Sequence, residues 1–519
     1  MMQGRDDGQR QFLDVESVAG HLLPPGSVFA FLAENRHALF PDSAFEDLFP
    51  SGRGRPSIPG EVIASVLVLQ AIHNVSDRQT AEAVTFDLRW KAACGFAVAD
   101  TSFHHSVLTY WRRRLAASER PHRIFDAVAE VIASTGVLSG RRRRAVDSTI
   151  LDDAVARQDT VTQLIAQIRR VARTVPAAAD LVAGLSGYDY SVPGKPDIAW
   201  DDPAARDQLI TNLVNDALSV LGGLEGAELS DAQSEAVALL ALVAGQDVEP
   251  AEGSDGTDGR WQIERKVAPD RVISTVDPET RHAHKSREKK QDGFKAHIVI
   301  EPDTGLVTAS ALTKAAGPQN SDAARGVELI AADTSITGQP VEVLGDSAYG
   351  SGEMLAEIQA AGHRAIIKPM PLNRAVPGGF TIDDFTVDHE SRVVTCPAGQ
   401  TRKITAKGRV TFGTICSWCP LAAQCTKSAR GRKMMIGVHD QIKRQHRTRA
   451  KEPDFQAVYR QHRPMVERSI AWMTPDARRV PYRGVVKNNA WWATRAAGIN
   501  LKRLLNLGLT LENGTWATA

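Results

Sequence analysis

Residues 341–351, VEVLGDSAYGS, place Asp346 directly after a short apolar run and before small, polar and glycine residues. Residues 141–149, RRRRAVDST, repeat this arrangement around Asp147. An apolar run that ends in a carboxylate predicts a buried strand with the acid at its C-terminal tip, where the ligand sites of α/β sheets gather. The alternative is that each Asp only caps the next element. The two stretches predict an α/β fold with two acids at one edge of a sheet.

A third acid, Glu467, lies in residues 459–472, YRQHRPMVERSIAW. Val466, Ile470 and Met473 recur around it at helical spacing, although an exposed helical Glu is ordinary and periodicity alone does not single it out. Two strands and one helix can bring three carboxylates together. Hard Mg²⁺ ions take carboxylate oxygens, and two ions about 3.5 to 4 Å apart can hold the attacking and leaving oxygens of a phosphodiester. The acids therefore indicate metal-dependent phosphoryl transfer by a nuclease or a strand transferase.

The chain resembles the DDE transposases of bacterial insertion sequences over nearly its whole length. In particular it is similar to the IS1182 group of the IS4/IS5-like superfamily, whose members carry a helical N-terminal module and a cysteine-bearing insertion. Carried over residue by residue, the catalytic triad of the family falls on Asp147, Asp346 and Glu467. Five stretches carry the resemblance: GRGRPSIPGEVIASVLVLQAIHNVSDRQTAEAV (52–84), AVDSTILDDAVARQDTVTQLIAQIRRV (145–171), DPETRHAHKSREKKQDGFKAHIVIEPDTGLVTA (277–309), VLGDSAYGSGEML (343–355) and RQHRPMVERSIAW (460–472).

A related branch of the family has the motif Y-x2-R-x3-E-x6-K around its catalytic Glu. Arg463 matches the Arg of this motif and lies one helical turn before the Glu, where it can pair with that carboxylate or hold a phosphate. Arg460 stands at the Tyr position with Tyr459 beside it, and Thr474 stands at the Lys position. The chain thus keeps the Arg of the motif and departs from its Tyr and Lys.

The resemblance implies a DNA transposase that binds the terminal inverted repeats of its element, cuts at the ends and joins the freed 3′-hydroxyls to target DNA. It implies two Mg²⁺ or Mn²⁺ ions as cofactors, double-stranded DNA as the partner and a homodimer on paired DNA ends. Two alternatives stay open: an RNase H-like DNA nuclease without strand transfer, and a catalytically inactive DNA-binding protein derived from such an element.

The composition is that of an ordinary soluble protein, with 43% hydrophobic and 24% charged residues. A chain of 519 residues exceeds what one core usually supports, so two or three domains are expected. No apolar stretch approaches the roughly 18 residues of a membrane span, and the first twelve residues lack the apolar core of a secretory signal. We expect a bacterial cytoplasmic protein that acts on the nucleoid and has no membrane partner.

The net charge of +1 hides a strong segregation along the chain. Residues 151–259 hold 19 acids against 6 Lys or Arg, whereas residues 427–503 hold 19 Lys or Arg against 5 acids. Because phosphate neutralisation supplies most non-specific DNA affinity, the local charge matters more than the sum. The alternative is that such clusters are solvated faces. The residues expected to contact DNA are Arg112, Arg113, Arg114, Arg143 and Arg468.

The order of predicted elements favours an RNase H-like catalytic core with insertions. Helical patterns begin near Pro59, Ser76 and Thr101 in an N-terminal all-helical, DNA-binding-like domain, and the second of them covers residues 78–93. The predicted domains are residues 1–125 for the N-terminal helices, residues 140–150, 277–370 and 452–510 for the core, residues 151–276 for an acidic helical insertion, and residues 371–450 for a second insertion with a zinc knuckle and β structure.

Four of the five cysteines fall within about 30 residues of the second insertion. A C-x2-C pair with two further cysteines nearby predicts a structural Cys₄ zinc site in a cytosolic chain. Free thiols or buried apolar cysteines are the alternative. The predicted ligands are Cys396, Cys416, Cys419 and Cys425, and Cys94 is interpreted as a small buried apolar residue.

Overall fold

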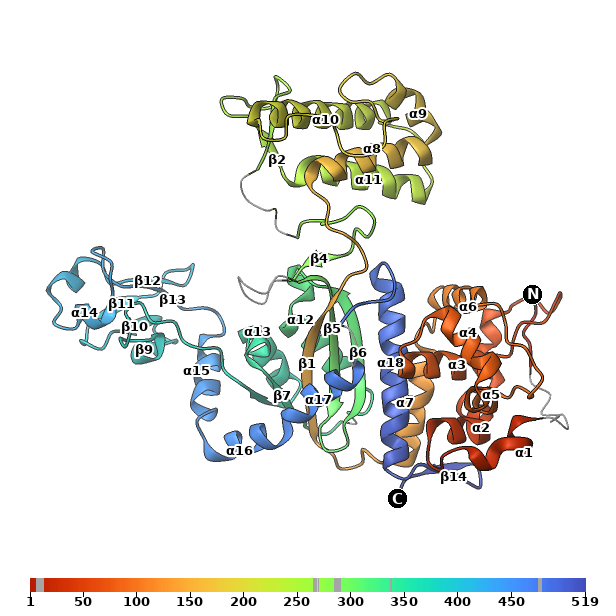
Figure 1. Cartoon of the computed structure of the whole chain (residues 1–519). Coiled ribbons are helices and arrows are strands. Elements are labelled where there is room, and N and C mark those ends of the chain that lie inside the picture. The colour runs from red at the N-terminus through yellow and green to blue at the C-terminus, as the bar shows by residue number, and fades with distance from the viewer. Residues whose placement is uncertain (6–13, 265–267, 269, 284–290, 337, 475–477) are drawn as a thin grey trace.

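A six-stranded mixed sheet lies at the centre of the computed structural model, which describes residues 1–5, 14–264, 268, 270–283, 291–336, 338–474 and 478–519 (Figure 1). The strand order is β4-β5-β1-β7-β8, and β6 also pairs with β5. β5 pairs antiparallel with β1 and with β6, whereas β7 pairs parallel with β1 and with β8. The strands are β1 (Arg143–Asp152), β4 (Arg281–His282), β5 (Asp292–Glu301), β6 (Leu306–Lys314), β7 (Glu342–Gly345) and β8 (Arg364–Ile367).

Helices cover both faces of this sheet, because the central strands send apolar side chains alternately to its two sides. Ala145 and Leu151 of β1 pack with helices α17 (Pro464–Met473) and α18 (Val485–Asn506) on one face. Val146 packs with helices α12 (Asp322–Ala332) and α13 (Gly352–Ala360) on the other. The segments around the three acids therefore fold into one layered α/β unit.

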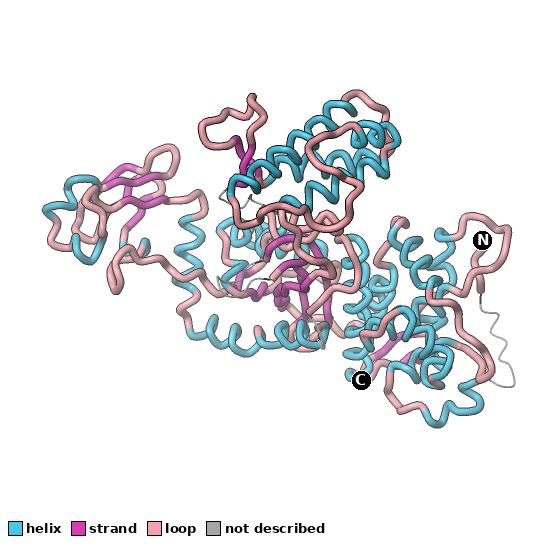
Figure 2. Tube along the Cα trace, turned by 45° about the horizontal axis from the view of Figure 1, so that its top comes forward, coloured by secondary structure: helices cyan, strands magenta, loops and turns pink. Residues whose placement is uncertain are grey.

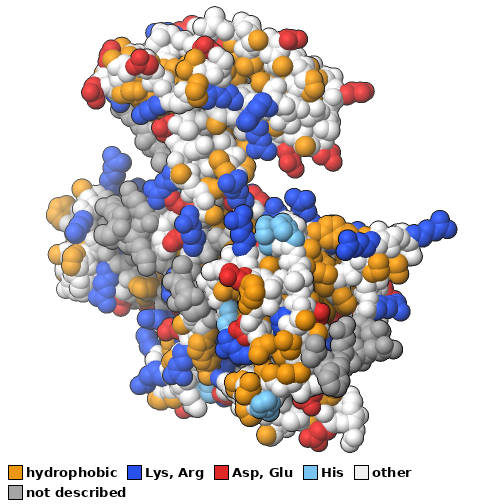
Figure 3. Space-filling view, turned by 45° about the vertical axis from the view of Figure 1, so that its right-hand side comes forward, with side chains coloured by type: hydrophobic (Ala, Val, Ile, Leu, Met, Phe, Trp, Pro, Cys, Tyr) orange, Lys and Arg blue, Asp and Glu red, His pale blue; other side chains and the backbone are white. Residues whose placement is uncertain are grey.

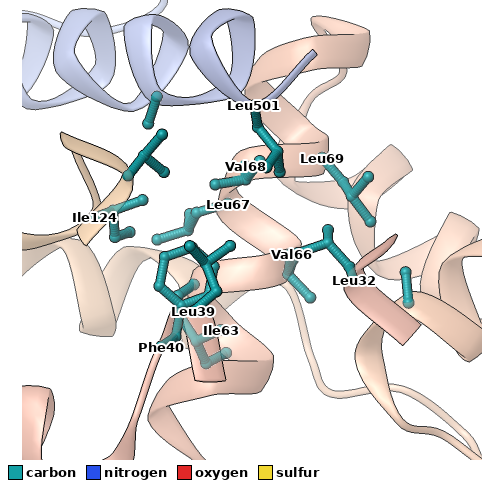
Figure 4. Close-up of a cluster of buried hydrophobic side chains, with 14 of the residues drawn as sticks. Leu32, Leu39, Phe40, Ile63, Val66, Leu67, Val68, Leu69, Ile124 and Leu501 are labelled. Carbon is teal, nitrogen blue, oxygen red and sulfur yellow. The ribbon is translucent and has the colours of Figure 1, made fainter. Parts of the chain in front are cut away.

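The helices that precede the sheet form a separate apolar cluster around α3. This helix is buried on nearly all sides, and its residues Ile63, Leu67 and Leu69 pack against helix α2, helix α7 and Leu501 of α18 (Figure 4). α18 thus joins the N-terminal helices to the sheet. The helices are α1 (Val15–Ala19), α2 (Val28–Leu39), α3 (Gly60–His73), α4 (Asp77–Phe86), α5 (Leu88–Cys94), α6 (Ser106–Ala116) and α7 (Arg123–Thr135).

The single helix predicted over residues 78–93 is wrong, because α4 and α5 are separate helices. Asp87 between them has an extended backbone, and its carboxylate accepts a hydrogen bond of 2.9 Å from the N–H of Arg89. Asp favours such caps over helix interiors because its short side chain competes for backbone N–H groups. The third predicted helix begins later than expected, at Ser106.

A hydroxyl cap starts α4, and its removal should be measurable. The Ser76 hydroxyl accepts a hydrogen bond from the N–H of Gln79, whose side chain accepts one from the N–H of Ser76. We expect Ser76→Ala to lower the free energy of unfolding by about 1 kcal/mol. Ser76→Thr keeps the hydroxyl and should lose much less. Urea unfolding of the two variants tests this, and equal losses would contradict a capping role.

A helical bundle with its own core follows β1 and stands off the sheet (Figures 1 and 2). Its buried residues include Leu164, Leu213 and Val243, and Asp and Glu side chains are scattered over its surface, the upper body of Figure 3. The elements are α8 (Thr160–Thr174), α9 (Pro176–Ala183), α10 (Pro203–Gly223), α11 (Asp231–Gln246), β2 (Val248–Pro250) and β3 (Trp261–Ile263).

Residues 371–439, here called the cysteine arm, project from the sheet on the side away from the N-terminal helices (Figure 1). Phe385, Val410 and Phe412 belong to a small core of their own. Helix α15 (Asp440–Arg449) follows the arm, and a ring nitrogen of its buried His446 lies 2.7 Å from the carbonyl oxygen of Ile367 in β8. The arm contains β9 (Thr386–Asp388), β10 (Val393–Thr395), β11 (Thr401–Lys403), β12 (Arg409–Thr411), β13 (Lys433–Met435) and α14 (Ala422–Cys425).

The chain then returns to the sheet and to the N-terminal helices. Helix α16 (Pro453–His462) leads into α17, and a hairpin of β14 (Thr510–Glu512) and β15 (Thr515–Ala517) follows α18. Trp516 of this hairpin lies with its ring centre 5.7 Å from that of Phe31 in α2. No described helix has the length and apolar character that crossing a membrane requires.

Candidate active site

Asp147 lies in the middle of β1, so the prediction that it ends this strand is wrong. β1 pairs with the ten-residue strand β5 as far as Asp152, but its pairing with the four-residue strand β7 stops at Ala145. The apolar run before Asp147 carries no information about where the neighbouring strands β5 and β7 end, and these two strands end at different points along β1. Asp147 therefore stands just past the last residue that β7 covers.

Asp346 directly follows β7, as predicted. One of its carboxylate oxygens accepts a hydrogen bond of 2.9 Å from the N–H of Ala348 and so caps a short 3-10 helix, Ser347–Tyr349. Ala145 and Leu344 are paired in the parallel ladder, and each acid lies two residues beyond its member of this pair. Asp147 and Asp346 therefore emerge at the same edge of the sheet.

Arg463 and Glu467 approach this edge from the junction of α16 and α17. Pro464 is the first residue of α17, a position where its missing N–H costs no helical hydrogen bond. A ring nitrogen of the buried His462 lies 3.0 Å from a carboxylate oxygen of Asp303. This contact ties the helix junction to the turn between β5 and β6.

Arg463 joins two of the three predicted carboxylates. Its Nη2 lies 3.0 Å from Oδ2 of Asp147, and its Nη1 lies 3.6 Å from Oε1 of Glu467. The side chains of Arg463 and Asp147 are only 7% and 13% exposed, whereas Glu467 is 68% exposed. The other oxygen of Asp147 accepts a hydrogen bond of 2.8 Å from the N–H of Ser148. A buried guanidinium thus lies between the strand acid and the helix acid.

The pKa shifts reflect how closely these groups lie. Burial raises the pKa of Asp147, the charge of Asp346 adds to the rise, and Arg463 opposes it. Burial would lower the pKa of Arg463, but the charges of Asp147, Tyr459 and Glu467 raise it overall. Burial also raises the pKa of Tyr459, and all three carboxylates add to that rise. Tyr459, one residue before the Tyr position of the related motif, therefore lies at the same site.

A second polar cluster lies on the opposite face of β1, where Ser148 points because successive strand residues alternate. Ser148 Oγ donates to one oxygen of Asp322 at 2.5 Å, and Lys295 Nζ donates to the other at 3.2 Å. Burial lowers the pKa of the nearby His297 to about 3. The cluster fixes the backbone next to Asp147. The sequence does not reveal this cluster because its residues lie far apart in the chain, and its one local sign is an acid at the start of α12.

The four cysteines of the arm line one small cavity together with Phe385 and Phe412. None of the five cysteines forms a disulfide. Burial raises the pKa of the Cys425 thiol, Arg432 opposes this rise, and the three other thiols add to it. Cys94 is buried in the N-terminal helices, where burial raises its pKa to about 12.

The arginines that we expect to contact DNA fall into two groups. Arg112 forms an ion pair with Asp77 and a hydrogen bond with Gln70. Arg114 donates to the carbonyl of Leu48 and lies over the ring of Phe49. Arg143 Nε lies 3.0 Å from a carboxylate oxygen of Glu342. These intramolecular contacts give the three a part in holding the fold together. Arg113 and Arg468 are exposed and form no ion pair within the described residues. As DNA contacts all five stay predictions.

Asp147, Asp346 and Glu467 offer carboxylate oxygens, which are ligands that divalent cations bind, although the three side chains do not converge on one point. Across the described ranges, no three His, Cys, Asp or Glu side chains lie close enough to hold a metal ion as they stand. Carboxylate oxygens are the ligands that Mg²⁺ and Mn²⁺ prefer, and the exposed Glu467 has room to turn. Among the described contacts, Nε and Nη1 of the buried Arg463 have no hydrogen-bond acceptor. The site therefore fits an ion together with an anionic group that accepts from Arg463.

Two family models match the chain, one toward each end. A transposase DDE domain matches residues 393–505, and a transposase domain, DUF772, matches residues 21–114. The first match contains Arg463, Glu467 and the four cysteines of the arm but neither Asp147 nor Asp346. No curated protein and no solved structure gave a significant match.

The structure of this chain has a mixed α/β fold. The two matches indicate a transposase. More particularly, they indicate an insertion-sequence DDE transposase of the IS1182 type, the family that the sequence motifs resemble.

Proposed function

We propose that the protein binds the terminal repeats of its element, cuts the DNA at the element ends and joins the 3′-hydroxyls to target DNA. Asp147, Asp346 and Glu467 hold two Mg²⁺ or Mn²⁺ ions in this proposal. The observation that carries it is the meeting of the two strand acids at one sheet edge with the buried Arg463, which reaches Glu467.

We assign the central sheet and its covering helices to an RNase H-like core. An antiparallel group of β1, β5 and β6 is followed by α12, β7, α13 and β8 in alternation, and this order supports the assignment. The helices over residues 1–125, the acidic bundle and the cysteine arm are then additions to this core, and a homodimer on paired ends is part of the proposal.

The chain's own residues bind and orient the DNA at the site. Ions bound by the three acids would supply the charge that activates water or a 3′-hydroxyl for in-line attack. Arg463 donates from Nε and Nη1 to phosphate oxygens, which are the acceptors a guanidinium prefers. The cluster of Ser148, Asp322 and Lys295 holds the strand behind Asp147, so that the carboxylate keeps its position.

An assay with three readouts separates the proposal from its rivals. The purified protein is incubated with a labelled duplex that ends in the terminal repeat, a supercoiled target plasmid and Mg²⁺. Cleaved ends together with joined plasmid products support a transposase that transfers strands. Cleavage without joined products indicates an RNase H-like nuclease. Binding of the duplex without cleavage indicates an inactive DNA-binding protein.

We also propose that the arm carries a structural zinc ion held by Cys396, Cys416, Cys419 and Cys425. Four thiols around one cavity have the donor chemistry that Zn²⁺ takes in structural sites. We expect the purified protein to contain about one zinc per chain and Cys419→Ser to lose most of it, whereas Cys94→Ala should keep it. Elemental mass spectrometry of the dialysed proteins measures this. Wild-type protein without zinc, or an unchanged content in Cys419→Ser, would refute the site.

A further inference from the structure

The cysteine arm has an unusual charge distribution that the proposed function has not used. Residues 391–439 contain nine Lys or Arg and no Asp or Glu. Charge runs of this kind are the electrostatic footprint of nucleic-acid binding when their side chains stay free. The nine residues are Arg392, Arg402, Lys403, Lys407, Arg409, Lys427, Arg430, Arg432 and Lys433.

Most of these cations are exposed and have no counter-ion. None of the nine forms an ion pair with any described residue, in contrast to Arg143 and Arg144, which pair with Glu342 and Asp333. Six of the nine are also exposed and donate no side-chain hydrogen bond to a described residue. Arg432 is buried and donates to the carbonyl of Cys425, so it belongs to the fold of the arm. The unpaired positive charges are therefore available to an external polyanion. The six are Lys403, Lys407, Arg409, Lys427, Arg430 and Lys433.

Two of these cations stand on the outer face of a two-stranded ribbon formed by β12 and β13. Arg409 pairs with Met435, and Lys433 pairs with Thr411, and all four are exposed. Val410, which lies between the two pairs, points into the core of the arm. A two-stranded ribbon is narrow enough to enter the major groove of duplex DNA.

A groove lies between this ribbon and the start of α13. It has a volume of about 720 Å³ and is lined by β13 and Val438 on the arm, by Lys443 of α15, and by residues 350–353 at the start of α13. Residues 350–353 come only four positions after Asp346. The groove therefore runs from the ribbon to the segment that follows Asp346 in the chain.

We propose that the β12–β13 ribbon of the cysteine arm, with Arg409 and Lys433 on its outer face, is a DNA-binding surface that holds the duplex next to the cleaved end. This inference rests on the proposed function, because the duplex it binds is the substrate of the same site. It adds a contact surface on the far side of the sheet from the N-terminal helices, to which DNA binding had been assigned from sequence.

The test compares two matched double variants of the full chain. Arg409→Ala with Lys433→Ala removes the two ribbon cations, and Arg173→Ala with Arg206→Ala removes two exposed cations of the acidic bundle. Affinity for a labelled random-sequence duplex and for the terminal-repeat duplex is measured by fluorescence anisotropy over a series of salt concentrations. Circular dichroism checks that both variants are folded.

We expect the ribbon variant to bind both duplexes at least roughly tenfold more weakly than wild type. The slope of log K against log salt concentration should become less negative by about 1.8, which is about 0.9 for each of the two lost phosphate contacts. The bundle variant should match wild type. An unchanged affinity and salt slope in the ribbon variant, with wild-type protein that still cleaves end DNA, would overturn the inference and leave the proposed function intact. A ribbon variant that alters only self-association would also overturn it, since the surface would then bind protein. Wild-type protein that neither binds nor cuts DNA would reject both.

Discussion

Asp346→Asn should abolish DNA cleavage and joining while leaving the fold and DNA binding intact. Asn keeps the side-chain oxygen that accepts the hydrogen bond from the N–H of Ala348, so the turn after β7 is preserved. It removes one of the three negative charges that we propose to hold the ions. Because metal ligation supplies several kcal/mol of transition-state stabilisation, we expect the cleavage rate to fall by about 10³-fold or more.

The measurement is single-turnover cleavage of a labelled end duplex in Mg²⁺, with the affinity for the same duplex measured in parallel. Asp201→Asn is a matched control, since it removes an exposed carboxylate of the acidic bundle. It should leave both quantities unchanged. Cleavage that persists in Asp346→Asn at more than about a tenth of the wild-type rate would refute the proposed triad.

Arg463→Gln should destabilise the metal-free protein strongly at neutral pH. The guanidinium lies 3.0 Å from Asp147, and both side chains are largely buried. Removing one partner of a buried ion pair leaves the other charge uncompensated, which costs about 3 kcal/mol. The exposed neighbour Arg468 supplies the control, and Arg468→Gln should change the free energy of unfolding by less than about 0.5 kcal/mol.

The loss in Arg463→Gln should depend on pH with a defined sign. The pKa of Asp147 is already raised by burial in the folded protein, so its ionised form opposes folding above that pKa. Without Arg463 the pKa rises further. As the pH falls through the raised pKa the carboxyl takes up a proton, and the uncompensated charge disappears. Urea unfolding at about pH 7 and about pH 5 should therefore show a smaller difference from wild type at the lower pH. A difference that grows on acidification would contradict the ion pair.

The sequence predicted the sheet and the place of Asp346 because these features depend on local pattern. The short apolar run before Asp346 predicts a strand, and β7 lies where this run is. The prediction that Asp147 ends its strand was wrong, because the point where β1 stops pairing with β7 depends on the length of β7, which is distant in the chain. The break at Asp87 was missed because one side chain outweighed a continuous helical pattern.

The candidate site was predictable only in part. Arg463 and Glu467 are one helical turn apart, so their proximity follows from local spacing, but nothing in the periodicity shows that they face Asp147. Tyr459 was seen only as a neighbour of the motif position. Asp322 and Lys295 were missed, since Asp322 lies 174 residues from its partner Ser148 and such pairs are set by tertiary packing alone.

The central claim is that Asp147, Asp346 and Glu467 share divalent ions in one pocket. Its most direct test is a crystal structure of the protein grown with Mn²⁺ and end DNA, with the ions located by their anomalous scattering. The account predicts Mn²⁺ peaks at the sheet edge within about 2.0–2.4 Å of carboxylate oxygens from all three residues, with Arg463 turned from Asp147 toward a phosphate. Manganese bound elsewhere, or at fewer than two of these three acids, would contradict it.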